Sequence, residues 1–177
     1  MIYILVALED ELKFNPNPNK YTIVYSGVGK INAAYTATRI ALRNDCDLIV
    51  NYGTAGTFDR SAIGQLISIG TVKQRDVDAR PLSPLGTTPF DKVADISVDK
   101  FSTWTLSTGD NFITSPPELD SDLVDMEAYA IAKVCKKLMM PFKCYKYVTD
   151  LADENAANDW QSNVSKGEKE FWKIFNS

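Results

Sequence analysis

The residues of this chain best suited to chemistry are carboxylates at the ends of apolar segments. Three consecutive acids, 9–11, follow the apolar segment 2–8. Asp150 ends a second apolar run, 142–149, and Glu127 stands where a helix is expected to begin. Open α/β sheets place ligand chemistry at the carboxyl ends of their strands. Because the chain contains no histidine, acid–base chemistry must fall to carboxylates, Lys, Tyr or Cys.

Each of these acids also has an ordinary structural explanation. A cluster such as 9–11 is often a solvated turn, and an acid such as Glu127 at a helix start is favourable for the helix dipole alone. Asp153, three residues beyond Asp150, is more typical of a local cap or orienting partner. The positions of the acids alone leave the structural and the chemical explanation open.

Two glycine-rich segments follow other expected strands. Gly27-Val28-Gly29-Lys30 precedes a helix, where such a turn can hold a phosphate, but the third glycine of the dinucleotide fingerprint is absent. Segment 51–56, Asn-Tyr-Gly-Thr-Ala-Gly, is either a strand terminator or a close backbone approach to a sugar. In the second case the Thr54 hydroxyl becomes a candidate ligand.

Composition narrows the class of protein. With 177 residues, 45% of them hydrophobic, we expect one globular domain, 1–177, with a sizeable core. The net charge of −4 argues against a nucleic-acid partner. Segment 2–8 has no basic lead-in, and no run approaches membrane-spanning length, so we expect no membrane partner. Three cysteines without metal-type spacing favour reduced thiols in the cytoplasm.

The hydrophobic pattern predicts strands that alternate with helices. We expect strands at 2–8, 21–25, 48–52, 65–72, 104–108 and 142–149, and helices after Lys30 (with Ile31, Ala34, Thr38 and Ala41 on one side), at 126–138 and at 166–175. Residues 79–92 are rich in Pro and Gly and are expected to be loop. This order favours a three-layer α/β/α sandwich with a mixed, largely parallel central sheet; a doubly wound nucleotide-binding sheet is the alternative.

Two segments resemble a known family. Asp125-Met126-Glu127-Ala128 and Thr149-Asp150-Leu151-Ala152-Asp153 are similar to the signature segments of the methylthioadenosine/adenosylhomocysteine nucleosidases, within the nucleoside phosphorylase superfamily. Weaker likenesses occur at 27–34, 53–56 and 107–113, and the resemblance as a whole extends from residue 7 to residue 153. It implies a phosphorylase/hydrolase-like fold.

The resemblance implies two catalytic residues. Asp150 matches the general acid that protonates purine N7, and Glu11 matches the residue that positions and deprotonates the attacking water. A general acid must hold its proton near neutral pH, so we expect partial burial to raise the pKa of Asp150. Departure of the base leaves positive charge on the ribose ring, as in glycoside hydrolysis, and no metal or other cofactor is expected.

The resemblance also implies a set of substrate-binding residues. Glu127 accepts hydrogen bonds from the ribose hydroxyls, and Met126 packs on the sugar. Phe112 stacks on the purine, and the backbone of Ile113 reads the adenine edge; from the sequence alone, Phe112 is more typical of a core residue. The expected substrate-binding set is completed by Thr54, Asp125 and Thr149.

The choice of nucleophile depends on positive charge. In the phosphorylases of this superfamily an Arg shortly before the position of Thr54 helps to hold phosphate, whereas this chain has Asn51 and Tyr52 there. With no Arg near the signature segments, water is the expected nucleophile. We expect hydrolysis of the N-glycosidic bond of adenine nucleosides such as methylthioadenosine or adenosylhomocysteine. The alternatives are a purine nucleoside phosphorylase and a non-catalytic nucleoside-binding protein on the same fold.

The chain departs from the family at several positions. Only fifteen residues separate Glu11 from Gly27, where the family usually has a strand hairpin. Lys146 stands where Arg is common, and Asp125 where Glu is common. These differences bear on the group recognised at the ribose 5′ position and on assembly.

The resemblance implies a homodimer in which a segment of one subunit closes the 5′ pocket of the other. The Pro-rich loop 79–92 is the candidate segment. Arg80 in this loop has three open explanations: it faces solvent, braces the loop, or meets a substrate carboxylate.

Overall fold

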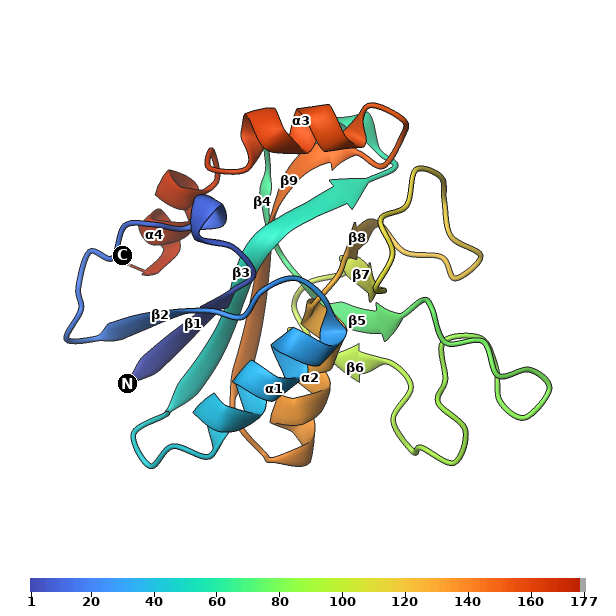
Figure 1. Cartoon of the computed structure of the whole chain (residues 1–177), viewed down its shortest axis with the longest axis horizontal. Helices are drawn as coiled ribbons and strands as arrows, with labels where there is room; N and C mark the ends of the chain where they lie inside the picture. Colours follow the sequence, from blue (N-terminus) through green and yellow to red (C-terminus); the bar gives the residue numbers. More distant parts are fainter. Residues whose placement is uncertain (176–177) are drawn as a thin grey trace.

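The computed structural model describes residues 1–175, which form a central sheet with helices on both faces (Figure 1). The strands are β1 (Ile2–Val6), β2 (Tyr21–Tyr25), β3 (Leu48–Thr57), β4 (Leu66–Ser68), β5 (Thr71–Gln74), β6 (Ile96–Ser97), β7 (Thr105–Thr108), β8 (Leu123–Asp125) and β9 (Phe142–Leu151). The helices are α1 (Lys30–Ala41), α2 (Ala128–Lys137), α3 (Ala156–Asn163) and α4 (Glu168–Phe175), with short 3-10 turns η1 (Glu9–Glu11) and η2 (Arg60–Ala62). The last two residues of the expected domain, 176–177, lie outside the described residues.

The sheet is mixed and largely parallel, as expected. Its strand order is β2-β1-β3-β8-β7-β5-β6, with β9 pairing both β3 and β4. Among the described strands, five pairs are parallel and three are antiparallel. Strands β3 and β9 run parallel along almost their whole length, so the ends of both reach the same edge of the sheet.

Alternate residues of the central strands feed two separate cores. Tyr3 and Leu5 of β1 pack towards α1 and α2, whereas Ile4 and Val6 pack towards α4 on the opposite face. A strand covered on both faces reads as a continuous apolar run because neither face meets water. This packing confirms the three-layer arrangement. None of the helices within residues 1–175 is long and apolar enough to cross a bilayer.

Helix α1 forms where it was predicted, and its most buried side chains are neighbours of the expected ones. The side chains of Ala33, Ala37 and Ile40 are buried against the sheet and α2, while Ile31 is 82% exposed. Of the side chains expected on one side of this helix, Ala34 and Ala41 pack partly buried against the same core, and only Ile31 points to solvent. Small alanines allow α1 and α2 to approach closely, and this packing decides which side of a weakly amphipathic helix turns inward.

Strand boundaries differ from the prediction where tertiary contacts override local signals. The expected strand 48–52 continues to Thr57, because β9 and the end of β8 hold it extended. The expected strand 65–72 is two strands, β4 and β5. They separate at Gly70, where a Cβ would lie 2.0 Å from the Ser102 carbonyl oxygen.

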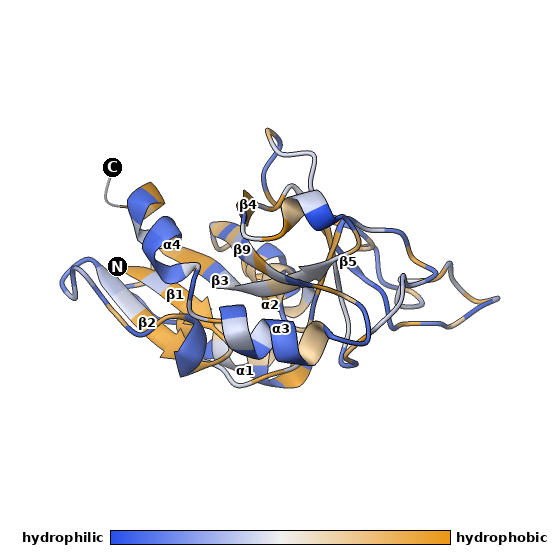
Figure 2. Ribbon diagram, turned by 90° about the horizontal axis from the view of Figure 1, so that it is seen from above, coloured by the Kyte–Doolittle hydropathy of each residue, from blue (hydrophilic) through white to orange (hydrophobic). Residues whose placement is uncertain are grey.

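Three further elements, β6, β8 and α3, were not predicted. Strand β8 ends directly before the expected helix 126–138, and α2 begins two residues later than expected, at Ala128. Helix α3 is hydrophilic over most of its length (Figure 2) and buries only Ala156 among its residues, so its sequence carries no apolar stripe. Loop 79–92 contains no helix or strand, as predicted.

Candidate active site

A cavity of about 250 Å³ lies at the edge of the sheet where β3 and β9 end. Its lining includes Ala7 and Leu8, just after β1, and residues of η1, β3, β8, β9 and α3, so the cavity draws on nearly the whole length of the chain. Eight of the nine candidate site residues line it, namely Glu11, Thr54, Phe112, Ile113, Asp125, Met126, Glu127 and Asp150. The ninth, Thr149, is buried behind the cavity wall.

Glu11 is the one acid of the 9–11 cluster that turns inward. It is 4% exposed, whereas Glu9 and Asp10 are exposed to solvent. Its Oε1 accepts hydrogen bonds from the Thr54 backbone N–H and hydroxyl, both at 2.8 Å. Its Oε2 accepts from the Leu8 N–H at 3.1 Å. The solvated-turn explanation therefore fits Glu9 and Asp10, and a buried, aligned carboxylate remains.

Glu127 opens α2 without capping it. Its Oε1 accepts a hydrogen bond of 2.9 Å from the N–H of Gly29, at the start of α1. The amides of Glu127 and Ala128 instead donate to Asp125 Oδ2, at 3.2 and 2.8 Å. The helix-dipole explanation thus belongs to Asp125. Burial, reinforced by the nearby Asp125 carboxylate, raises the pKa of Glu127 above its usual range.

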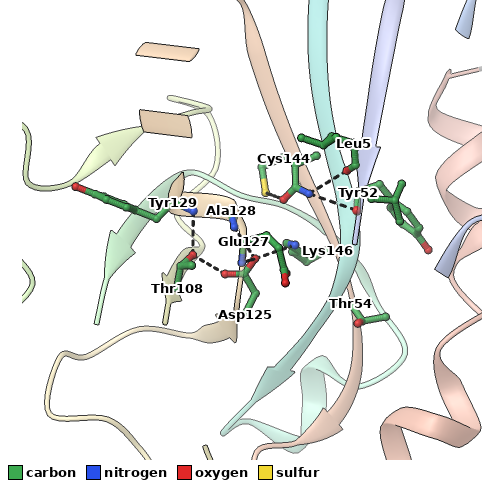
Figure 3. Close-up of polar contacts among 12 residues, drawn as sticks. Leu5, Tyr52, Thr54, Thr108, Asp125, Glu127, Ala128, Tyr129, Cys144 and Lys146 are labelled. Atoms are coloured by element: carbon green, nitrogen blue, oxygen red, sulfur yellow. Dashed lines mark hydrogen bonds and ion pairs between the residues drawn. The ribbon is translucent and has the colours of Figure 1, made fainter. Parts of the chain in front are cut away.

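Asp125 is held by a buried polar network (Figure 3). Lys146 Nζ lies 2.9 Å from Asp125 Oδ2, and the Thr108 hydroxyl donates to Oδ1. Thr108 in turn accepts the Tyr129 N–H at 2.9 Å. Although burial disfavours a charged amine, the Asp125 carboxylate raises the pKa of Lys146. Asp125 was expected to contact the substrate. Both of its carboxylate oxygens are instead engaged by the protein, so Asp125 organises the cavity wall.

Asp150 lies near the end of β9 and is 4% exposed. Burial raises its pKa to about 6, as anticipated for a group that must retain a proton. The Thr149 hydroxyl donates a hydrogen bond of 2.6 Å to Asp150 Oδ2. Thr149, expected to touch substrate, therefore contacts Asp150 in place of the cavity.

The glycines of segment 53–56 make room for charged side chains. A Cβ at Gly53 would lie 3.2 Å from both Glu11 Oε1 and Lys146 Nζ, and one at Gly56 would lie 3.0 Å from Asp150 Oδ1. The segment is part of β3 and does not terminate it. Its small residues allow the acids to approach the strand end.

The start of α1 is already occupied by carboxylates. Besides the bond from Gly29 to Glu127, the Lys30 N–H donates to Asp110 Oδ1 at 2.7 Å. The Lys30 ammonium lies 2.6 Å from Asp76 Oδ1. A turn that resembled a phosphate site thus uses its amides to hold the protein's own acids.

The cavity wall is acidic. Among the described residues, four carboxylates line it (Glu11, Asp125, Glu127 and Asp150) against one cation, Arg75. No group of three His, Cys, Asp or Glu side chains within residues 1–175 has the arrangement of a metal site. The arrangement suits proton transfer and stabilisation of a cationic transition state.

Comparison with known proteins places this geometry in a family. A family model described as the phosphorylase superfamily matches residues 17–176. The chain belongs to the phosphorylase superfamily. A 5′-methylthioadenosine/S-adenosylhomocysteine nucleosidase of Bacillus subtilis (strain 168) is 29% identical over 160 residues, which cover 76% of this chain and 69% of that protein. One from Staphylococcus saprophyticus is 29% identical over 170 residues, with 81% and 74% covered.

Solved structures of nucleosidases share the fold of this chain. A putative 5′-methylthioadenosine/S-adenosylhomocysteine nucleosidase from Francisella philomiragia superposes with a TM-score of 0.85 at 20% identity, covering 99% of this chain and 98% of that one. The nucleosidase from Helicobacter pylori, solved with butyl-thio-DADMe-Immucillin-A, gives a TM-score of 0.82 at 22% identity, with 94% and 92% covered.

Arg75 is a residue of the site that was not predicted from the sequence. It follows β5, lines the cavity and is 8% exposed, which corrects the expectation that no Arg approaches the signature segments. Its terminal amino groups donate to four backbone carbonyls, those of Ser107, Gly109, Asn111 and Asp125. The guanidinium therefore fastens segment 107–111 to β8. Only its position after a predicted strand signalled a structural role.

The apolar part of the site is more open. Phe112 is 57% exposed, so the expectation of a core residue from the sequence alone was wrong. Phe112, Ile113 and Met126 line the cavity on the side of β8 and the 109–113 segment. An exposed aromatic ring at the edge of an acidic cavity offers a stacking surface for a planar base.

Proposed function

We propose that this chain hydrolyses the N-glycosidic bond of adenine nucleosides, such as methylthioadenosine or adenosylhomocysteine, and releases adenine. The observation that carries this proposal is the meeting of Glu11, Glu127 and Asp150 around one cavity. A second support is that the relatives from Bacillus subtilis and Staphylococcus saprophyticus are both 5′-methylthioadenosine/S-adenosylhomocysteine nucleosidases. We assign the activity to residues 1–177 acting as one domain, because the site draws on segments from Ala7 to Trp160.

In the proposed mechanism Asp150 is the general acid. With a pKa of about 6, it retains a useful fraction of its proton near neutral pH. The proton passes to purine N7 while the bond between the anomeric carbon and N9 breaks, and the bonding electron pair leaves with the base. The Thr149 hydroxyl holds Oδ2, which fixes the orientation of the carboxyl group. Such catalysis typically contributes roughly 10²–10⁴ in rate.

Glu11 serves the nucleophile. Its carboxylate is fixed by Thr54 and Leu8, so it accepts the proton of a water molecule as the water oxygen bonds to the anomeric carbon. Glu127 binds the ribose hydroxyls, because one carboxylate oxygen is held by Gly29 and the other accepts no bond from residues 1–175. Phe112, Ile113 and Met126 hold the base and sugar by apolar contact.

Water is favoured over phosphate as the nucleophile because Arg75 in the cavity wall and Lys146 buried beside Asp125 are already engaged. Arg75 donates to backbone carbonyls, and Lys146 is paired with Asp125. A phosphate dianion would enter a cavity with four carboxylates. The test is chromatography of methylthioadenosine incubated with the protein, with and without phosphate. We expect adenine and free methylthioribose in both samples. A sugar 1-phosphate would establish a phosphorylase, and unchanged substrate would establish a non-catalytic binding protein.

We also propose a homodimer in which loop 79–92 covers the site of the partner. Leu82 and Phe90 in this loop are 74% and 99% exposed, which suits burial against another subunit. Arg80 braces the loop, pairing with Asp78 and Glu118 at 2.6 Å each. Light scattering checks the assembly, and Phe90→Ser should weaken it; a fully active monomer would contradict a shared pocket.

The three free cysteines support a cytoplasmic location.

A further inference from the structure

A tryptophan from α3 joins the hydrogen-bond system of Glu11. The indole Nε1 of Trp160 donates to Thr54 Oγ1 at 2.9 Å, and Thr54 Oγ1 donates to Glu11 Oε1 at 2.8 Å. Trp160 is half-buried and lines the same cavity as Glu11 and Thr54. The three side chains come from α3, β3 and η1, so no local sequence pattern connects them.

The chain of bonds has a fixed direction. An indole N–H can only donate, and a carboxylate can only accept. The Thr54 hydroxyl has one hydrogen, so it accepts from Trp160 and points that hydrogen at Glu11. Without the indole N–H, the hydroxyl is free to rotate and to donate elsewhere, including to a bound water or to a sugar oxygen.

Helix α3 is well placed to maintain this contact. At its last residue, the Asn163 side-chain amide donates to the Thr149 carbonyl oxygen at 2.7 Å. One turn earlier, Trp160 donates to Thr54. The helix is thus tied to β9 beside Asp150 and to β3 beside Glu11, although its own face buries little apolar surface.

We propose that Trp160 is a positioning residue that orients the Thr54 hydroxyl and, through it, the carboxylate of Glu11 for attack by water. This inference rests on the proposed role of Glu11 as the group that activates the nucleophile. The indole N–H of Trp160 contributes to the chemical step, whereas its ring stays part of the cavity wall when Trp is replaced by Phe. Loss of the N–H alone therefore acts on kcat and leaves KM nearly unchanged.

The first test compares two matched substitutions, Trp160→Phe and Trp172→Phe. Both keep an aromatic ring and remove an indole N–H, but the Trp172 N–H has no hydrogen-bond partner within residues 1–175. For Trp160→Phe we expect kcat to fall by about threefold to tenfold, the range of one net hydrogen bond, with KM within about twofold. Trp172→Phe should leave both constants near the parent values. An unchanged kcat in Trp160→Phe would overturn the proposal.

The second test repeats Trp160→Phe in a Thr54→Val background. Thr54→Val removes the hydroxyl and should lower kcat by about tenfold to a hundredfold, because that hydroxyl donates to a charged group. If Trp160 acts through Thr54, adding Trp160→Phe then changes kcat by less than about twofold. A packing defect caused by the smaller ring would lower kcat equally in both backgrounds, and that result would also overturn the proposal.

Glu11→Gln separates this inference from the function beneath it. If Glu11→Gln abolishes most turnover while Trp160→Phe has no effect, the role of Trp160 fails and the proposed mechanism stands. If Glu11→Gln keeps near-parent turnover, the proposed role of Glu11 fails and the role of Trp160 fails with it.

Discussion

Lys146 and Asp125 form one buried ion pair, with 2.9 Å between Nζ and Oδ2 and both side chains 1% exposed. These are the two positions at which the sequence departs from the Arg and Glu that are common in the nucleosidases it resembles. The structure shows that the two departures meet in a single contact. A shorter cation therefore accompanies a shorter acid, and the buried charge at the base of the site remains balanced.

Removing one partner of this pair should destabilise the fold strongly. Lys146→Met leaves the Asp125 carboxylate buried without its counter-ion, and we expect a loss of about 3–5 kcal/mol in the free energy of unfolding. Lys133→Met is the control, because its pair with Asp91 is more exposed and should contribute about 0–1 kcal/mol. Urea denaturation measures both. Equal losses in the two variants would show that burial of the Lys146–Asp125 pair carries no special cost.

Asp150→Asn should remove most turnover while leaving ligand affinity within a few fold. The amide retains the shape of the side chain but cannot donate the catalytic proton, so we expect kcat to fall by roughly 10²–10⁴. Asp153→Asn is the matched control, since its carboxylate accepts a local bond from Asn155 and lies outside the cavity wall. Release of adenine from methylthioadenosine provides the assay. Near-parent turnover in Asp150→Asn would remove this residue from the mechanism.

Glu127→Gln should weaken both binding and rate through the ribose hydroxyls. A hydrogen bond to a charged group contributes about 1.5–3 kcal/mol, and this one strengthens as the ring gains positive charge. A 2′-deoxy substrate should therefore be much poorer than the parent substrate for the unmodified protein, but only slightly poorer for the variant. Measurement of kcat/KM for both proteins with both substrates tests this prediction. An equal penalty in both proteins would assign Glu127 to structure alone.

The raised pKa of Asp150 also predicts how stability depends on pH. Because burial raises this pKa to about 6, the folded protein holds the proton more tightly than the unfolded chain, in which the pKa of an Asp is about 3.9. The stability that the protonated Asp150 adds to the folded state is fully present below about pH 4 and is lost as pH rises through about 6. Asp150→Asn, which cannot ionise, should therefore raise the thermal midpoint at pH 8 and raise it less at pH 4. Calorimetry at the two pH values checks the sign; a larger gain at pH 4 would contradict it.

Local patterns in the sequence determined much of the architecture. Apolar runs such as 2–8 and 142–149 gave strands because hydrophobic periodicity depends only on neighbouring residues. The acids at the ends of those runs reached one cavity because parallel strands end at the same edge of a sheet. Helix α3 escaped prediction because its residues are polar and few of them are buried.

Only the tertiary structure decided the partner and the environment of each side chain. Glu9 and Glu11 have the same chemistry, yet one faces water and the other accepts three hydrogen bonds. Trp160 and Thr54 lie 106 residues apart, and Gly29 and Glu127 lie 98 apart. Hydrogen bonds and pKa shifts depend on distances of a few ångströms and on exclusion of water, and both are set by how the layers pack.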